Sequence, residues 1–549
     1  MNRESLPGDV PGTSPDAPPP RTGTGMFRST FAIAFYTLIS RIAGFIRDIF
    51  MTAVLGTSAS ADAFFIAIRL ANLGRSLFAE GALSAAFVPM FSGHLEQSGR
   101  TKAFRFANII LNWLLVILLA VTLVTELLMP FIVLVFAPGF TSVPGKIELA
   151  TLFSRIAFPY LLLVSLVTLL SGVLNSMGRF WIGAAAPILL NLAMISALLI
   201  AVPYNANPGL LLAWSCPVAG IAQLCFLIYA SRRIGLKWRL QIPRPSPEVQ
   251  KLLRLLLPVA LAGVIGWGAI LVTSALASFQ ESAVSFLQYA ERLYHLPLSL
   301  IGVSLGVVLL PELSRQWRGI HHDRALKSQN RALEFALLLA MPAAVLLFLL
   351  SEPIINVLFE RARFTASDTR ATAAALGVMA WGLPAAVLAH IFVTVFYARQ
   401  DTKTPLLYNA ISNGVYVLAA CGFFFVIGYV GIALAASLAA WTHAILLGVV
   451  LHRGGHLVFD ARLRKRAGRF LASAAVMVVV VLGLHQGGGT GPLAESLGSG
   501  LFGRASVLFV LFCGGLFAYA VACQLTGAAH WREIIEIVLP QYSRKQEKP

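Results

Sequence analysis

The stretch FYTLISRIAGFIRDIF (residues 35–50), followed shortly by ADAFFIAIRLANLGRSLFAEGA (residues 61–82), reads as two consecutive membrane helices that carry many charges. An unpaired arginine at the centre of a membrane helix costs about 2.5 to 3.5 kcal/mol on insertion scales, so several of them need a common reason. An anionic ligand in a central cavity supplies that reason. The charged residues are Arg41, Arg47, Asp48, Asp62, Arg69, Arg75 and Glu80.

The composition is typical of a polytopic membrane protein. Of 549 residues, 58% are hydrophobic and 12% are charged, against about 25% charged in soluble proteins. The formal net charge of +18 comes mostly from short connections beside apolar runs, which indicates a topology signal and not a nucleic-acid partner. Five cysteines lie in apolar stretches without metal-ligand spacing, so we expect reduced thiols that pack in the interior.

Apolar runs of spanning length recur along the whole chain. We count fourteen of them between residues 28 and 524, the thirteenth being short. The predicted fold class is therefore an all-α polytopic membrane protein with fourteen transmembrane helices. Basic residues gather in the even-numbered connections and both tails, so the positive-inside rule predicts that both termini are cytoplasmic.

The two halves of the chain share an internal repeat. LVFAPGFT, ending at Thr141, recurs as VLFERARFT, ending at Thr365, and three further pairs are Pro159 with Pro384, Pro89 with Pro311, and Asn191 with Asn413. The offsets are 224, 225, 222 and 222 residues, and their agreement indicates a duplication. Each copy would hold six helices, an even number, which predicts two lobes related by a pseudo-two-fold axis along the membrane normal, with a cavity between them.

This repeat sets the predicted domain organisation. The polar segment at the N-terminus lacks the apolar core of a signal peptide, so we expect a disordered tail. The last two spans lie outside the repeat. The predicted parts are a tail (1–26), an N-terminal lobe (27–235), a C-terminal lobe (250–452), two extra helices (466–526) and a cytoplasmic C-terminal tail (527–549).

Helical spacing gives the charged residues a geometry. Arg41 and Asp48 are seven residues apart, which places them on one helix face, and Asp62 and Arg69 share the same spacing. The run QYAERLYHLP (288–297) lies in the predicted helix 283–311, which corresponds to the helix 60–92 in the repeat, and adds Glu291, Arg292 and His295. Guanidinium groups bind phosphate oxygens in bidentate fashion, so a pyrophosphate is the natural occupant of the cavity.

A purely structural role stays open for some of these residues. Near the outer helix ends, Arg47, Asp48 and Asp62 could equally snorkel or form local ion pairs. Arg41 and Arg292 lie deep in their spans, as does Arg75, and such residues usually line functional interiors.

Motifs for direct chemistry are missing. We find no P-loop, no metal-ligand cluster and no nucleophile elbow. The sequence therefore favours a transporter over an enzyme, with no cofactor, and with coupling to the membrane potential or an ion gradient in place of ATP.

Several of these motifs closely resemble the MurJ (MviN) family of lipid II flippases, which belongs to the multidrug/oligosaccharidyl-lipid/polysaccharide exporter superfamily. The motifs are SRIAGFIRD (40–48), ADAFF (61–65), LFAEGA (77–82), QYAERL (288–293), LFERARFT (358–365) and FYARQDTKTP (396–405). The resemblance covers about residues 27–452. It implies two six-helix lobes, a lipid-tail groove between two extra helices, and transfer of undecaprenyl-pyrophosphate-linked muropeptide across the bacterial inner membrane during peptidoglycan biosynthesis, on which cell shape depends.

The resemblance also assigns roles to residues. Arg41, Arg47, Arg75 and Arg292 correspond to cavity arginines that bind the substrate. Supporting or gating positions fall on Ser40, Asp48, Asp62, Glu80 and Glu291, and the charge pattern adds Arg69 and His295. The sequence departs from many relatives at His295, where they carry an acidic residue, and at Ala71, where they carry proline.

Partners and alternatives follow from the same reasoning. We expect a monomer whose partners are lipid II, membrane lipids and other cell-wall synthesis proteins, with no nucleic acid. The alternatives are an exporter of another polyprenyl-linked saccharide, or a drug/cation antiporter, which would need an acidic cavity. A membrane glycosyltransferase would need a catalytic carboxylate on a sizeable external loop, and the longest external connections are poor in such residues.

Overall fold

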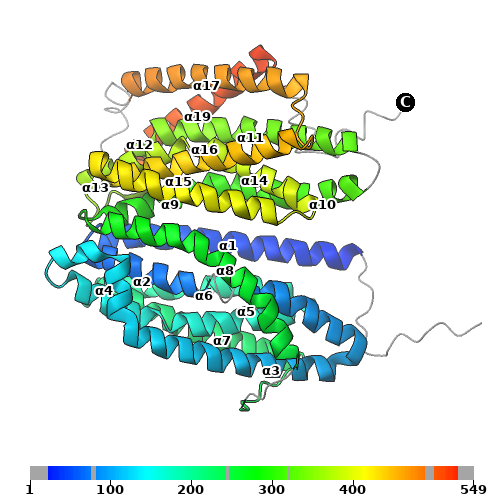
Figure 1. Ribbon diagram of the computed structural model, residues 1–549. Helices are drawn as coiled ribbons and strands as arrows, with labels where there is room; N and C mark the ends of the chain where they lie inside the picture. The colour runs from blue at the N-terminus through cyan, green and yellow to red at the C-terminus, as the bar shows by residue number, and fades with distance from the viewer. Residues whose placement is uncertain (1–22, 76–81, 243–246, 319–321, 489–499, 530–549) are drawn as a thin grey trace, which may run out of the picture. The chain divides into compact units, whose positions relative to one another are not determined.

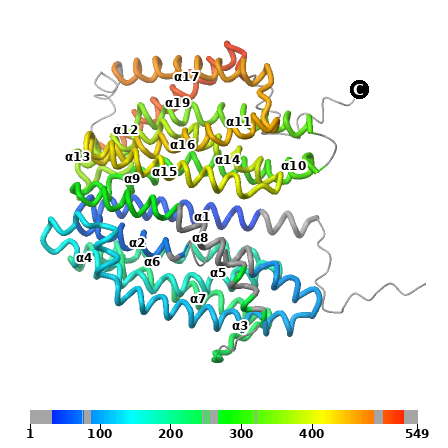
Figure 2. The backbone as a smooth tube through the Cα atoms, viewed as in Figure 1, coloured from blue at the N-terminus to red at the C-terminus, as the bar shows by residue number. Residues whose placement is uncertain are grey.

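The computed structural model describes residues 23–75, 82–242, 247–318, 322–488 and 500–529. These residues are helical apart from short turns and connections, and they contain no strand (Figures 1 and 2). Glu80, predicted in a supporting role, lies outside the described residues.

The helices follow one another with short connections. Their bounds are α1 (Gly23–Leu55), α2 (Ala59–Arg75), α3 (Ala82–Phe136), α4 (Lys146–Ala157), α5 (Tyr160–Ser176), α6 (Phe180–Ala201), α7 (Pro208–Arg233), α8 (Pro247–Ser278), α9 (Ala283–Leu298), α10 (Ser304–Arg318), α11 (His322–Leu349), α12 (Ser351–Phe359), α13 (Ala366–Ala380), α14 (Leu383–Ala398), α15 (Lys403–Ile427), α16 (Tyr429–Arg453), α17 (Ala461–Gly488) and α19 (Leu501–Thr526).

Many of these helices can cross a membrane. Among the described residues, ten spans are long and apolar enough, or eleven if α13 and α14, which meet at a 45° bend, count as one. Large apolar side chains remain exposed on them, including Leu127, Phe425 and Phe502 at 79%, 83% and 83% exposure. Because such surface is stable only against lipid, the chain is an all-helical, multi-span membrane protein.

Glycine and proline shape the long helices locally. Gly99 divides α3 with φ 77° and ψ 174°, a conformation that a side chain would disfavour. Pro297, near the end of α9, lacks the N–H that a continuous helix needs, and the residues after it form a single π turn at Ser299–Val303 before α10 begins.

The chain divides into two compact units. Unit 1 comprises Met1–Val54, Ile66–Leu134 and Gly145–Val264; unit 2 comprises Leu55–Phe65, Val135–Pro144 and Ile265–Pro549. Two short segments from the first half of the sequence therefore belong to unit 2. Three of the unit boundaries fall within helices α2, α3 and α8, one falls at the last residue of α1, and one falls in the connection before α4.

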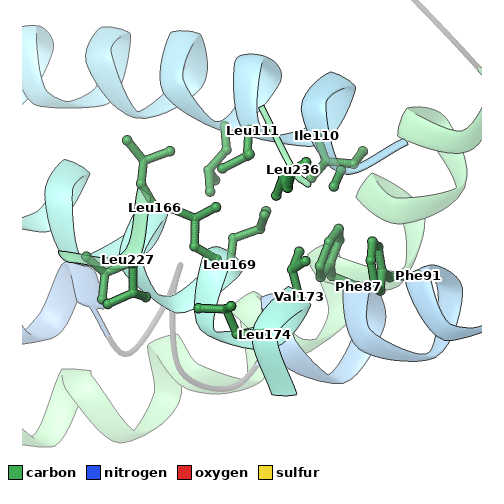
Figure 3. Close-up of a cluster of buried hydrophobic side chains, with 14 of the residues drawn as sticks. Phe87, Phe91, Ile110, Leu111, Leu166, Leu169, Val173, Leu174, Leu227 and Leu236 are labelled. Atoms are coloured by element: carbon green, nitrogen blue, oxygen red, sulfur yellow. The ribbon is translucent and has the colours of Figure 1, made fainter. Parts of the chain in front are cut away.

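Unit 1 has a core of aromatic and branched side chains. The rings of Phe87 and Phe106, both on α3, stack with centroids 5.7 Å apart, and α5 and α7 contribute to the same cluster. Leu236, which follows α7 in an extended segment, lies in this cluster with Ile110 and Leu111 (Figure 3).

Unit 2 has several core clusters, of which two are large. One unites α10, α11, α14 and α16, and the other packs α17 and α19 against α11, beside which they run in Figure 1. A Cβ added at Gly515 of α19 would lie 2.7 Å from Val481 Cγ2 of α17. Such close approach at a small residue is the common way for membrane helices to associate.

Candidate functional site

Arg47 is the centre of a buried polar network in unit 1. Its side chain on α1 is only 10% exposed, and Nε and Nη2 donate to Asp48 Oδ1 at 3.0 and 2.7 Å. Nη1 donates to Asn191 Oδ1 on α6 at 2.9 Å, and Asn191 Nδ2 donates to the Ser40 carbonyl at 3.0 Å. The guanidinium is therefore oriented by the Asp48 and Asn191 side chains, and Asn191 is in turn held by the Ser40 carbonyl.

The other predicted residues of unit 1 differ in their surroundings. Arg41, on α1, is exposed and makes no hydrogen bond or ion pair with the residues that the structure describes. Arg75 is half-buried at the end of α2, where its Nε donates to Asn72 Oδ1 at 3.2 Å. Arg69 is half-buried six residues earlier on the same helix.

Helix α9 of unit 2 carries three of the predicted residues. Arg292 and His295 are exposed, and Glu291 is half-buried. The rings of Tyr294 and His295 lie 5.6 Å apart. The five cysteines are free thiols, and no group of His, Cys, Asp and Glu side chains among the described residues could hold a metal ion.

Asp62 lies in unit 2, where it caps a helix that is far away in sequence. Its carboxyl is fully buried, and Oδ1 accepts from the Ser285 N–H at 2.9 Å and from Ser285 Oγ at 2.5 Å. Ser285 is in the first turn of α9, whose own N-cap residue, Ser282, makes no side-chain cap bond. An acceptor at this position satisfies a donor that the helix leaves free.

The segment around Asp62, residues 55–65, is held in unit 2 by further bonds. Tyr289 Oη donates to the Gly56 carbonyl at 2.9 Å, and Ser282 Oγ donates to the Thr57 carbonyl at 2.6 Å. Thr57 Oγ1 donates to Asp368 Oδ1 at 2.7 Å. We call this segment the 55–65 turn.

Gly56 lets the 55–65 turn approach its neighbours. The residue has φ +60°, and a Cβ there would lie 2.6 Å from the Arg363 carbonyl oxygen. Only glycine meets both the left-handed conformation and the close approach.

Sequence reasoning missed most partners of these charged groups. In the sequence, Asn191 was noted only as part of the internal repeat. An amide inside an apolar run is nevertheless a usable signal for a buried polar contact. Nothing in the sequence singled out Ser285, Thr57 or Tyr289, because their partners are 223, 311 and 233 residues away.

Removing the Asp62 cap is expected to destabilise unit 2. Asp62→Leu would leave the buried Ser285 N–H and hydroxyl without an acceptor, which costs about 1–3 kcal/mol for each group. Thermal unfolding in detergent should show the loss, whereas Asp62→Asn keeps an acceptor and should lose less. Glu352→Gln, at an exposed carboxyl, is the control, and an unchanged midpoint for Asp62→Leu would show that the cap contributes nothing.

Comparison with known proteins gives a consistent result. The family described as "Lipid II flippase MurJ" matches residues 51–488. A probable lipid II flippase MurJ of Rhizobium tropici is 41% identical over 517 residues, covering 93% of this chain and 95% of that protein. One of Rickettsia prowazekii (strain Madrid E) is 35% identical over 459 residues, covering 83% and 90%.

Solved structures agree at the level of the fold. The structure titled "Lipid II flippase MurJ, inward closed conformation" superposes with a TM-score of 0.75 at 24% identity, covering 92% of this chain and 99% of that one. An inward-facing multidrug resistance MATE family transporter of the MOP superfamily gives 0.64 at 14% identity, covering 79% and 99%. The family match covers most of the chain, and the sequence relatives span nearly their whole length, so this chain belongs to the lipid II flippase MurJ family.

Proposed function

We propose that this protein is a transporter that moves lipid II from the cytoplasmic to the periplasmic leaflet of the bacterial inner membrane. The observation that carries the proposal is the family match over residues 51–488, together with the near full-length relatives. A protein is needed for this transfer, because a charged pyrophosphate and its sugars cannot enter the hydrocarbon core of the membrane without a large desolvation cost.

Arg41 is the first candidate for contact with the pyrophosphate. It is exposed and has no polar partner in the described part of the chain, so its donors are available. Arg47 already donates hydrogen bonds to Asp48 and Asn191. These bonds fix the orientation in which its guanidinium would meet the pyrophosphate. With Arg75 and Arg292, these residues form the proposed binding set, supported by Ser40, Arg69, Glu80, Glu291 and His295.

The proposed mechanism is alternating access by two six-helix lobes within a fourteen-helix protein whose termini are both cytoplasmic. Binding of the pyrophosphate would neutralise the arginines, and release would restore their mutual repulsion. A negative-inside potential could then return the cationic cavity, at about 2.3 kcal/mol per charge per 100 mV if the charge crosses the full field. The protein would act as a monomer without a cofactor, on lipid II supplied by cell-wall synthesis enzymes.

Asp62 fits a gating role in this scheme. The five hydrogen bonds that hold the 55–65 turn in unit 2 join it to α9, to the N-cap residue of α9 and to α13. Any step of the cycle that moves this turn must break them together, which would make the docked state a discrete conformation.

A leaflet-accessibility assay tests the proposed function. In cells depleted of this protein, lipid II should accumulate in the inner leaflet, and expression of the chain should restore its exposure to an external reagent. Proteoliposomes with purified protein should translocate lipid II faster than undecaprenyl-pyrophosphate linked to an unrelated saccharide. Unchanged exposure after depletion would refute the proposal, and a reversed substrate preference would replace lipid II by another polyprenyl-linked saccharide.

A further inference from the structure

The extended segment that follows α7 in unit 1 is bound along its edge by two asparagines. Asn108 Nδ2 donates to the Lys237 carbonyl at 3.2 Å, and Asn108 Oδ1 accepts from the Arg239 N–H at 3.1 Å. Asn112 Nδ2 donates to the Arg239 carbonyl at 2.9 Å, and Asn112 Oδ1 accepts from the Gln241 N–H at 3.3 Å. Four hydrogen bonds thus join α3 to the connection between α7 and α8.

The spacing of the two partners explains why this arrangement fits. Residues four apart on an α-helix rise by about 6 Å, and residues two apart on an extended chain by about 6.6 Å. Each asparagine amide offers one acceptor and one donor to the segment, as a residue of a neighbouring strand would. Two asparagines at i and i+4 can therefore replace a strand along this edge.

Buried and exposed side chains alternate along the segment, and the buried ones hold it on the side away from the solvent. Leu236 is buried and Trp238 packs against the same core, whereas Lys237 and Arg239 are exposed. Asn112 itself is only 3% exposed. The segment is thus held by apolar contacts and by hydrogen bonds in which both polar groups of each amide take part.

The second half of the chain contains the counterpart. Asn330 on α11 lies 222 residues after Asn108, an offset found in the sequence repeat. Its Nδ2 donates to the Val458 carbonyl at 2.8 Å, in the connection that follows α16. Leu457 is buried in the unit 2 core, as Leu236 is buried in the core of unit 1.

At the position that corresponds to Asn112, the amide is replaced by a carboxylate. Glu334, 222 residues after Asn112, is 5% exposed and pairs with Arg331, with Arg462 (3.4 Å) and with Arg466 (3.3 Å). Arg331 also pairs with Asp460 at 2.7 Å. This pairing holds the start of α17 against α11 in the way that the asparagines hold residues 237–241 against α3.

We infer that Asn108 with Asn112, and Asn330 with Glu334, are positioning residues for transport that fasten the connection leaving each half of the repeat to the third helix of that half. We call these pairs the exit clamps. The inference rests on the proposed function, because it concerns how motion is passed along the chain during translocation.

The unit 1 clamp controls how much chain separates α7 from α8. Thirteen residues lie between Arg233 and Pro247, and fixing the segment through Gln241 leaves five. A unit boundary falls within α8. A longer unfastened connection before this helix would therefore absorb a displacement of α7 that the clamp otherwise transmits to α8.

The double substitution Asn108→Ala/Asn112→Ala tests the unit 1 clamp. Hydrogen exchange at the Arg239 and Gln241 amides should accelerate at least tenfold, because both lose their acceptors. Translocation of lipid II in proteoliposomes should slow at least fivefold, while the Kd for lipid II stays within twofold. Asn409→Ala, at an exposed asparagine on α15, is the matched control and should change none of these.

Each alternative result is decisive. Unchanged amide exchange would show that the asparagines do not hold the segment, and faster exchange with normal translocation would show that the clamp has no positioning role. Should the double variant fold poorly, Asn108→Ala alone removes the bonds to Lys237 and Arg239 N–H and leaves both bonds from Asn112 to the segment, so it should slow translocation less. In unit 2, Asn330→Ala with Glu334→Gln should also slow translocation, and a normal rate would restrict the inference to unit 1. If the wild-type protein does not move lipid II, the proposed function fails and the transport role of the clamps fails with it, while the exchange measurement still decides whether the asparagines hold the segment.

Discussion

Replacing Arg41 by alanine is expected to reduce lipid II translocation at least 100-fold while leaving the stability of the protein unchanged. Arg41 is exposed and has no hydrogen-bonding partner in the described part of the chain, so its removal orphans no group and should change the free energy of unfolding by less than about 0.5 kcal/mol. Two charge-assisted hydrogen bonds to a phosphate contribute about 3–6 kcal/mol, which corresponds to two to four powers of ten.

Two further variants sharpen this test. Arg41→Lys keeps the charge and loses the planar fork, so it should retain part of the activity. Arg105→Ala removes an exposed arginine from α3 of the same unit and should translocate lipid II normally. The measurements are translocation in proteoliposomes and thermal unfolding in detergent. Normal translocation by Arg41→Ala would exclude Arg41 from the substrate site.

Replacing Arg47 by alanine should abolish translocation and also destabilise unit 1. The side chains of Arg47 and Asp48 are 10% and 13% exposed, and removing one partner of a buried ion pair costs about 3–5 kcal/mol because the other charge stays buried. Asn191 would lose the donor to its amide oxygen as well. This result would differ from that of Arg41→Ala, where only translocation is lost.

A double-mutant cycle separates the structural and functional parts of the Arg47 effect. The cycle comprises Arg47→Leu, Asp48→Leu and the double variant, which removes both charges and should be less destabilised than Arg47→Leu alone. Translocation should stay absent, because the anion-binding group is gone. If the double variant were both stable and active, Arg47 would have a structural role alone.

Local patterns sufficed for the class of the protein. Apolar runs and sparse charge predicted an all-helical membrane protein, which the structure confirms, and motifs such as SRIAGFIRD predicted the family that the comparisons show. The count of fourteen spans stays a prediction. Among the described residues ten or eleven spans meet the requirements of length and apolarity, and α2, with 17 residues, shows that a short, charged helix is hard to recognise in this way.

The polar networks were accessible only through the tertiary structure. The sequence indicated that Arg47 and Asp48 are adjacent charges in an apolar run, but Asn191, which orients the guanidinium, is 144 residues away. From the sequence, Asp62 could form a local ion pair or have a gating role. The structure shows that its carboxyl accepts a hydrogen bond from Ser285, 223 residues away.

What the sequence by itself determined, then, is the all-helical membrane class, the family and the charged residues to be examined, whereas the internal repeat stays a prediction. The tertiary structure decided which groups those charges meet, that the 55–65 turn belongs to unit 2, and that Asn108 and Asn112 bind the segment after α7. The physical reason is that hydropathy and helical period are properties of neighbouring residues. A hydrogen bond between distant residues requires both partners at one place in the fold, and only the packing of the helices sets that place.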